Sequence, residues 1–209
     1  MAVLCPTYAF EVYSQKVLII PNRDICNMVS DRNKVEPSEI IIEKLEDKHD
    51  LSSFQSYEKE LVDFLVEDAL NNQKQKLSVT FLWFYDNKLV GYVTLLNDKI
   101  NLEGDLKAFF REKDIHYKSL PALKIGRLCV HDNFQRRGLG KLMVLFAITQ
   151  ANEICDRRSG CRFITLDAKR NEKRELDSIH FYKRLGFKIL KERLKGTTPM
   201  YLDLKAPQQ

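Results

Sequence analysis

Residues 134–141 read Phe134-Gln135-Arg136-Arg137-Gly138-Leu139-Gly140-Lys141, and this stretch determines the architecture around it. It follows the apolar run 123–130, which has the β-branched residues of a strand, and it precedes the apolar run 142–148, which continues as a helix. The glycines let the backbone turn tightly, and the first turn of the helix directs its unpaired N–H groups and positive dipole end to the same place. Three cationic side chains, Arg136, Arg137 and Lys141, surround that place. The sequence therefore predicts a site for a phosphate or a pyrophosphate.

The spacing of the glycines excludes two common phosphate motifs. A P-loop has four residues between its glycines and a Ser or Thr after its lysine, whereas one residue separates Gly138 from Gly140 and Leu142 follows Lys141. A dinucleotide fingerprint has a third glycine three positions after the second, where this chain has Met143.

Composition indicates a soluble globular protein with one domain, or one domain with an appendage. The chain has 209 residues, of which 44% are hydrophobic and 30% charged. The longest strongly apolar run near the N-terminus, 17–20, is far shorter than a membrane span, and no basic region precedes it as in a signal peptide. The five cysteines are odd in number and form no C-x-x-C pair: Cys5, Cys26, Cys129, Cys155 and Cys161. We therefore expect no disulfide framework, no metal site and a cytoplasmic location. We also expect no membrane association.

Positive charge gathers in the second half of the chain. Twelve Lys and Arg face five acids between residues 121 and 174, a net charge of +7, although the whole chain carries only +5. A local excess of this kind suits a polyanionic ligand, either a nucleotide cofactor or a nucleic acid. The outlying Arg157, Arg158 and Lys173 fit an ordinary solvated surface equally well.

The order of the predicted elements indicates an α+β fold with a mixed sheet and helices on its faces. A hairpin is expected at Asp86-Asn87, because both residues tolerate a positive φ. Residues 1–38 are expected to be an N-terminal extension of unknown role, and residues 39–205 the main domain. The expected strands are 10–20, 40–42, 79–85, 88–95, 123–130, 162–166, 187–190 and 200–204. One helix is expected after a cap at Ser56, and three more are expected at 106–111, 142–157 and 176–185.

Two motifs in this order resemble the GCN5-related N-acetyltransferases (GNAT). Residues 135–140 match the pattern Gln/Arg-x-x-Gly-x-Gly/Ala of the acetyl-CoA pyrophosphate loop, and residues 181–187, Phe-Tyr-Lys-Arg-Leu-Gly-Phe, match F/L-Y-x-x-x-G-F about forty residues later. The resemblance covers roughly residues 40–204. It implies the GNAT fold, in which two parallel central strands, here 124–130 and 162–166, splay apart and admit the pantetheine arm of acetyl-CoA.

The resemblance also implies residue roles. The backbone of Leu128, Cys129 and Val130 would pair with the pantetheine amides like an added strand, and one N–H there would stabilise the oxyanion. The loop from Gln135 through Leu139 to Lys141 would hold the pyrophosphate, with Arg136 and Arg137 screening its charge. An acceptor amine would attack the thioester directly in a ternary complex, and Tyr182 would protonate the leaving thiolate. Cys129 is interpreted as a small core residue and not as a nucleophile.

The sequence does not single out one general base. Candidates are Asp167 at a strand end, His131 beyond the other strand, His180, or a chain of water molecules. A substrate amine of low pKa, such as that of an aminoacyl ester, needs no strong base. One departure from the family is that Glu175 stands where an Asn is common, three residues before Ser178.

Three hypotheses remain for what the chain acts on or binds. Phe64, Leu65, Ala69, Gln73 and the segment 89–95 resemble the GNAT branch that includes tRNA-acetylating toxins, which would imply an aminoacyl-tRNA acceptor and an antitoxin partner. A general N-acetyltransferase acting on a small amine, a peptide amine or a lysine is the main reading. A module that binds CoA or a protein partner without catalysis is the third. Domains of this family often pair, so a homodimer is one expected assembly.

Overall fold

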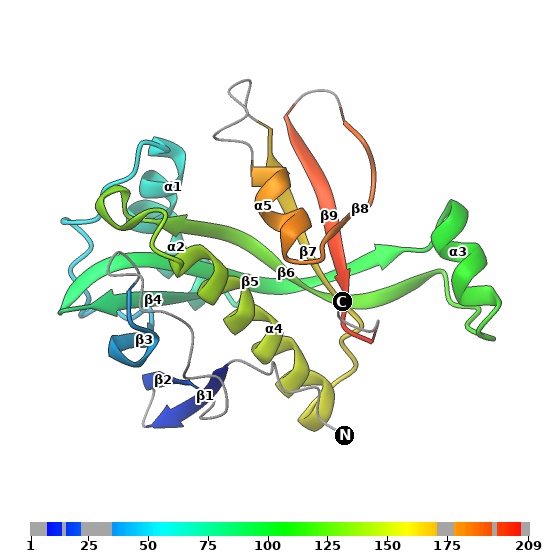
Figure 1. Ribbon diagram of the computed structural model, residues 1–209, viewed down its shortest axis with the longest axis horizontal. Helices are drawn as coiled ribbons and strands as arrows, with labels where there is room; N and C mark the ends of the chain where they lie inside the picture. Colours follow the sequence, from blue (N-terminus) through cyan, green and yellow to red (C-terminus); the bar gives the residue numbers. More distant parts are fainter. Residues whose placement is uncertain (1–7, 14–15, 22–34, 171–177, 194–195, 206–209) are drawn as a thin grey trace. The chain divides into compact units, whose positions relative to one another are not determined.

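The computed structural model describes residues 8–13, 16–21, 35–170, 178–193 and 196–205 (Figure 1). The chain divides into two compact units, Met1–Leu96 with Gly126–Thr149, and Asn97–Ile125 with Gln150–Gln209. We call them unit 1 and unit 2 and describe each by itself. Both combine a sheet with helices, as the predicted α+β class requires.

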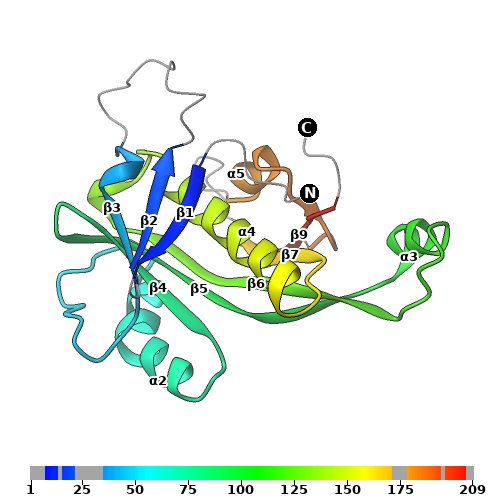
Figure 2. The same cartoon turned by 90° about the horizontal axis from the view of Figure 1, so that it is seen from below.

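Unit 1 contains an antiparallel sheet in the order β1-β2-β3-β4-β5, followed by β6 (Figure 2). The strands are β1 (Tyr8–Tyr13), β2 (Lys16–Pro21), β3 (Ile40–Lys44), β4 (Val79–Tyr85), the first part of β5 (Lys88–Asn101) and the second part of β6 (Ser119–Val130). The prediction of one strand over 10–20 is wrong, because β1 and β2 are separate strands that pair antiparallel from Tyr13↔Lys16 outward. In the sequence, the polar pair Ser14-Gln15 separates their two apolar runs.

The hairpin between β4 and β5 is confirmed. Asp86 and Asn87 have φ values of 50° and 54°, and Tyr85 pairs with Lys88 on either side of them. A two-residue turn with both φ values positive matches the twist of the flanking strands. The register set by the turn shifts by one residue between Phe84 and Trp83, so that Trp83 pairs with Gly91. Trp83, Tyr92 and Val93 lie beyond this shift, and each side chain is fully buried.

The first helical region of unit 1 has three parts. These are α1 (Lys59–Asp63), a π-helical turn (Phe64–Asp68) and α2 (Ala69–Lys74). The hydroxyl of Ser56 accepts a hydrogen bond from the Glu58 amide at 3.2 Å, although the helix begins only at Lys59. An apolar stripe at helical spacing packs in the core: Leu61, Phe64, Leu65, Ala69 and Leu70. Leu65 and Ala69 are fully buried, and the Tyr92 hydroxyl donates to the Leu61 carbonyl at 2.6 Å.

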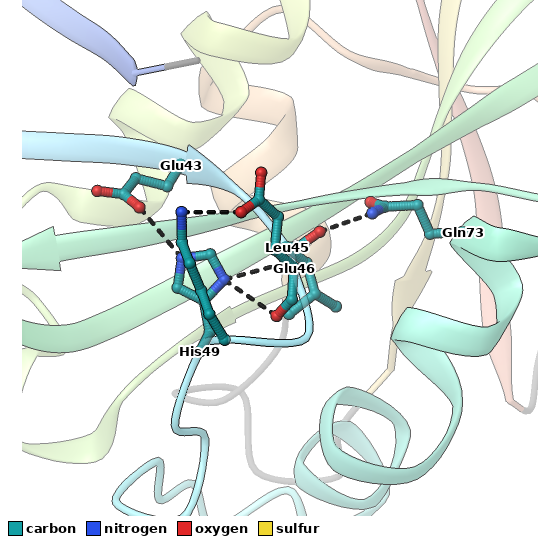
Figure 3. Close-up of polar contacts among 6 residues, drawn as sticks. Glu43, Leu45, Glu46, His49 and Gln73 are labelled. Carbon is teal, nitrogen blue, oxygen red and sulfur yellow. Dashed lines mark hydrogen bonds and ion pairs between the residues drawn. The ribbon is translucent and has the colours of Figure 1, made fainter. Parts of the chain in front are cut away.

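The loop after β3 is fastened to α2 by polar contacts (Figure 3). The side chain of Gln73 donates to the Leu45 carbonyl at 2.7 Å and accepts from the Thr80 amide at 3.1 Å. Within the loop, His49 Nδ1 accepts from the Glu46 amide at 2.9 Å, and its Nε2 lies 3.1 Å from the Glu43 carboxylate. Gln73, one of the residues that resemble the toxin branch, therefore joins α2 to both β3 and β4.

Helix α4 (Leu139–Arg157) begins three residues before the predicted Leu142. In unit 1 its Phe146 ring packs edge-on against Phe81 and Trp83, with centroids 5.0 and 5.8 Å apart. Gly91 on β5 allows this close approach, since a Cβ there would clash with the Met143 side chain and lie 2.7 Å from the Cys129 carbonyl. The helix start is therefore held against the strands that carry the predicted site.

Unit 2 contains a mixed sheet in the order β5-β6-β7-β9-β8. β7 (Phe163–Lys169) runs parallel to β6, from Ala122↔Phe163 to Ile125↔Leu166, and antiparallel to β9 (Thr197–Asp203), which also pairs with β8 (Lys188–Ile189). The other elements are α3 (Gly104–Arg111), at the far end of the β5–β6 ribbon in Figure 2, the last turns of α4 and α5 (Ser178–Arg184). The predicted parallel pair of central strands is confirmed.

β5 is longer than predicted, because it continues from Leu95 to Asn101. From Leu96 to Asn101, exposed side chains alternate with half-buried or buried ones, and Ile100 is buried. The Thr165 hydroxyl donates to the Asp98 carboxylate at 2.6 Å, and Phe110 packs edge-on against Phe163 at 5.8 Å. Polar residues that read as a loop in the sequence thus belong to a strand with partners from distant segments.

Candidate active site

The predicted phosphate loop connects β6 to α4 in unit 1. After β6 ends at Val130, a short 3₁₀ turn (Asp132–Phe134) leads into the loop 135–138. The His131 amide donates to the Val90 carbonyl at 2.9 Å, and the Asp132 amide donates to the Gln55 carbonyl at 3.2 Å. These two bonds fix the start of the loop to neighbouring segments.

The loop backbone has the conformation expected of an anion site. Arg136 and Gly138 have φ values of 61° and 90°, so the chain reverses sharply just before the helix. The first helical hydrogen bond runs from the Leu142 amide to the Gly138 carbonyl at 3.2 Å. The amides of residues 139–141 therefore precede the first bonded turn of α4, where a helix offers N–H groups to an anion. Gly138 is exposed, and a Cβ added there would meet nothing within 4 Å.

Cationic side chains surround this backbone. Arg136, Arg137 and Lys141 are all exposed. The Arg137 guanidinium lies 5.1 Å above the Phe134 ring, which itself packs edge-on against Tyr85. That contact positions one cation beside the loop, while Arg136 and Lys141 have no ion-pair partner among the described residues. Such a loop fits the two negatively charged groups of a pyrophosphate.

Gln135 fastens the loop to the end of its strand. Its side-chain amide donates to the Asp132 carboxylate at 2.8 Å and points to the Val130 carbonyl at 3.5 Å. Asp132 was not among the predicted site residues. The available signal was a carboxylate three residues before the glutamine, a spacing that one turn of chain brings into contact.

The strand residues 128–130 lead directly into the loop. Leu128 and Val130 are half-buried, and the Cys129 side chain is buried in the unit 1 core beside Tyr92. Burial raises the pKa of the Cys129 thiol to about 11, which keeps it protonated at neutral pH. The interpretation of Cys129 as a core residue is confirmed by this burial, since the thiolate is the nucleophilic form.

The second motif forms the end of α5 in unit 2. Gly186 has φ 87°, its amide donates to the Lys183 carbonyl at 3.0 Å, and the Phe187 amide donates to the Tyr182 carbonyl at 3.1 Å. These two bonds define a Schellman cap, whose apolar contact here is the Tyr182–Phe187 ring pair at 5.7 Å. The pattern Phe-Tyr-x-x-x-Gly-Phe is therefore a helix ending that holds one tyrosine in place.

Tyr182 lies between two aromatic rings. Phe181 packs edge-on at 5.0 Å on one side and Phe187 on the other, and Tyr182 is buried. Burial raises the pKa of its phenol to about 12, so the group retains its proton throughout the physiological range. Among the described residues, no hydrogen bond reaches this protonated hydroxyl.

Two of the three candidate bases already have partners. The Asp167 carboxylate forms an ion pair with Lys124 at 2.7 Å in unit 2. His131 accepts from the Asn133 amide at 3.2 Å in unit 1, and its ring lies edge-on to Phe54 and Phe134. His180 is exposed on α5, whereas Tyr182 two residues later is buried, so the two side chains lie on different faces of the helix.

Much of the predicted basic charge is also engaged. Carboxylates or aromatic rings hold five of the twelve cations of residues 121–174: Lys124 with Asp167, Arg127 with Glu60 and Phe64, Arg137 with Phe134, Arg162 with Asp203, and Arg170 with Glu192. The Ser178 hydroxyl donates to the Lys169 carbonyl at 2.9 Å, while Glu175, Lys173 and Arg174 lie outside the described residues.

The model of the acetyltransferase (GNAT) family matches residues 42–187, and the chain belongs to that family. It is thus an acetyl-CoA-dependent N-acetyltransferase with the GNAT fold. In the part of the chain that the structure describes, no helix is long and apolar enough to cross a membrane, and no group of three or more His, Cys, Asp or Glu side chains could hold a metal ion.

Known relatives include a tRNA-acetylating toxin of Mycobacterium tuberculosis (strain ATCC 25618 / H37Rv), 29% identical over 77% of this chain and 89% of that protein. A crystal structure of AtaTR bound with AcCoA matches with a TM-score of 0.63 and 25% identity, over 80% of this chain and 95% of that one. The fold is also that of AtaT complexed with acetyl-methionyl-tRNAfMet, with a TM-score of 0.66 and 24% identity over 79% and 95% of the two chains.

Proposed function

We propose that the chain acetylates the α-amino group of an aminoacyl-tRNA, as a toxin-type acetyltransferase. One observation carries this choice of acceptor: two candidate bases, Asp167 and His131, already bind other groups, and His180 lies on the opposite side of α5 from Tyr182. An α-amine has a pKa near 8, against about 10.4 for a lysine side chain, so it loses its proton without a strong base. The relative named as a tRNA-acetylating toxin supports the same acceptor.

In the proposed mechanism, the backbone of residues 128–130 aligns the pantetheine arm and the amides of residues 139–141 hold the pyrophosphate of acetyl-CoA. The neutral amine attacks the thioester carbonyl, a C–N bond forms, and the C–S bond breaks. The raised pKa keeps the Tyr182 phenol protonated at neutral pH, and Tyr182 donates this proton to the departing thiolate. The acetylated nitrogen releases its extra proton to water, and the Tyr182 phenolate takes a proton back from water, so the enzyme returns to its starting state.

A toxin of this kind would be held in check by an antitoxin, and we propose such a protein as its partner. Induced expression tests the proposal in cells. Growth arrest is expected with the unmodified chain and not with Tyr182→Phe, while Cys129→Ala serves as a control that keeps the arrest. Harmless expression of a chain that turns over acetyl-CoA with small amines would contradict the toxin reading. Stabilisation by acetyl-CoA without turnover on any amine would favour a binding module.

A further inference from the structure

A strongly cationic segment follows Tyr182 in unit 2. Between residues 178 and 193 the chain has five cations and a single acid, Glu192. All five cations are exposed, and we call them the α5–β8 cations: Lys183, Arg184, Lys188, Lys191 and Arg193. This segment lies beyond residues 121–174, over which the charge excess of the sequence was counted.

The carboxylates of the surrounding strands are already neutralised. Glu192 pairs with Arg170 at 2.8 Å, and Arg170 also donates to the Thr198 hydroxyl at 3.0 Å. Asp203 pairs with Arg162 and Asp167 with Lys124, both at 2.7 Å. Among the described residues, none of the α5–β8 cations has a carboxylate within ion-pair distance. Their charge is therefore available to a ligand.

The segment is also held rigidly by its other side. Ile179, Tyr182 and Phe187 are buried, and the Schellman cap at Gly186 fixes the end of α5. β8 pairs with β9 at Lys188↔Tyr201 and Ile189↔Met200, and the Leu190 amide donates to the Pro199 carbonyl at 2.8 Å. An apolar inner side and a cationic outer side on a fixed backbone form a preorganised surface for a polyanion.

We infer that the α5–β8 cations bind the phosphate backbone of the acceptor RNA; this inference rests on the proposed function. Two features favour RNA over an acidic protein. Protein interfaces need an apolar or aromatic centre, and Leu190 is the only large hydrophobic residue of the described segment that is exposed. Phosphate contacts need only spaced cations, and the α5–β8 cations supply them on one exposed segment of the chain.

The test is binding of fluorescent, uncharged tRNA to the full chain, measured by anisotropy at several salt concentrations. The triple variant Lys188→Gln/Lys191→Gln/Arg193→Gln should lower affinity roughly ten- to a hundredfold and reduce the slope of log K against log salt by about 2. The matched control, Lys107→Gln/Arg157→Gln/Arg158→Gln, removes the same charge from exposed positions elsewhere in unit 2 and should bind nearly as the unmodified chain. The conservative variant Lys188→Arg/Lys191→Arg should keep its affinity.

The inference is overturned if the triple variant binds tRNA like the unmodified chain, if both triple variants lose affinity equally, or if the unmodified chain binds no tRNA. The inference is also overturned, in favour of an acidic protein partner, if the triple variant loses binding to polyglutamate but keeps its binding to tRNA. Two further outcomes distinguish a failure of the proposed function from a failure of this inference. If the α5–β8 cations control tRNA binding but no aminoacyl-tRNA is acetylated, the surface stands and the acceptor is wrong. If the triple variant acetylates aminoacyl-tRNA with an unchanged KM, the acceptor stands and the surface is wrong.

Discussion

Two glycines, one in each unit, have nearly the same backbone conformation but different surroundings. Gly138 has φ 90° and precedes α4, whereas Gly186 has φ 87° and follows α5. At Gly186 the backbone amides already have partners, because the amides of Gly186 and Phe187 donate to carbonyls of the preceding helical turn. At Gly138 the amides that follow precede the first helical bond and lie among exposed cations.

A left-handed glycine does not by itself define a site. Its role depends on which end of a helix it occupies, since the start of a helix leaves N–H groups without partners and a capped end uses them. The turn at Gly138 therefore leaves backbone N–H groups outside the helical bonds, whereas the turn at Gly186 holds a side chain, Tyr182, in place.

The largest effect is expected for Tyr182→Phe. If the turn serves to position a proton donor, kcat should fall by roughly 10²- to 10⁴-fold while the Kd of acetyl-CoA stays the same. Initial rates of thiol release with a saturating amine, together with calorimetric binding of acetyl-CoA, measure both. A variant that keeps its kcat would reduce Tyr182 to a packing residue between Phe181 and Phe187.

The two glycines can be contrasted directly. Gly138→Trp should raise the Kd of acetyl-CoA at least about tenfold, and its left-handed φ should also lower stability by about 1–2 kcal/mol. Gly186→Ala should have only the second of these effects. It forces a Cβ into the left-handed region 3.4 Å from the Leu202 side chain, which lowers Tm and leaves the cofactor Kd unchanged in the folded protein. Equal effects of both variants on binding would abolish the contrast.

The Gln135–Asp132 contact should have a moderate effect. Removing one hydrogen bond that shapes the loop, by Gln135→Ala or Asp132→Ala, should raise the KM for acetyl-CoA about two- to tenfold. Because the two residues act through one contact, the double variant should be no worse than the more affected single variant. Additive losses in this double-mutant cycle would mean that each residue acts independently.

The pH dependence of kcat tests the surroundings of Tyr182. A general acid with an ordinary tyrosine pKa of about 10 would lose about three quarters of its protonated form at pH 10.5. A pKa of about 12 keeps kcat level to that pH, provided that circular dichroism shows the fold intact. Because the folded pKa lies above the unfolded value, burial of the neutral phenol stabilises the fold below about pH 10, and this contribution is lost as pH rises toward 12.

The smallest effect is expected for Cys129→Ala. The thiol is buried with a pKa of about 11, so it should react slowly with iodoacetamide, and its removal should leave kcat within about twofold. A modest loss of stability, about 1–2 kcal/mol, should follow from the cavity left beside Tyr92. Rapid alkylation with loss of activity would contradict this assignment.

The sequence was sufficient where local chemistry controls the structure. Asp86-Asn87 specified a hairpin, and Gly138 specified a sharp turn between a strand and a helix. It was insufficient where distant partners decide. The strand from Leu96 to Asn101 depends on contacts such as Asp98 with Thr165, and the π-helical turn at Phe64–Asp68 has no signal in the apolar stripe. The pairing of Arg162 with Asp203 likewise becomes visible only in the fold.

The roles of Gln135 to Lys141 and of Tyr182, and the boundary between residues 38 and 39, remain predictions. The pairing of β2 with β3 shows that residues before this boundary contribute to the sheet of unit 1. Residues around position 175 lie outside the described structure, so the departure at Glu175 also stays open.

The most direct measurement is mass spectrometry of aminoacyl-tRNA after incubation with the chain and acetyl-CoA, read as the aminoacyl-adenosine released by nuclease digestion. We expect a mass increase of one acetyl group on the α-amine of at least one aminoacyl-tRNA, absent with Tyr182→Phe and undiminished with Cys129→Ala. Acetylation of lysine peptides or small amines under the same conditions, with every aminoacyl-tRNA unchanged, would contradict it.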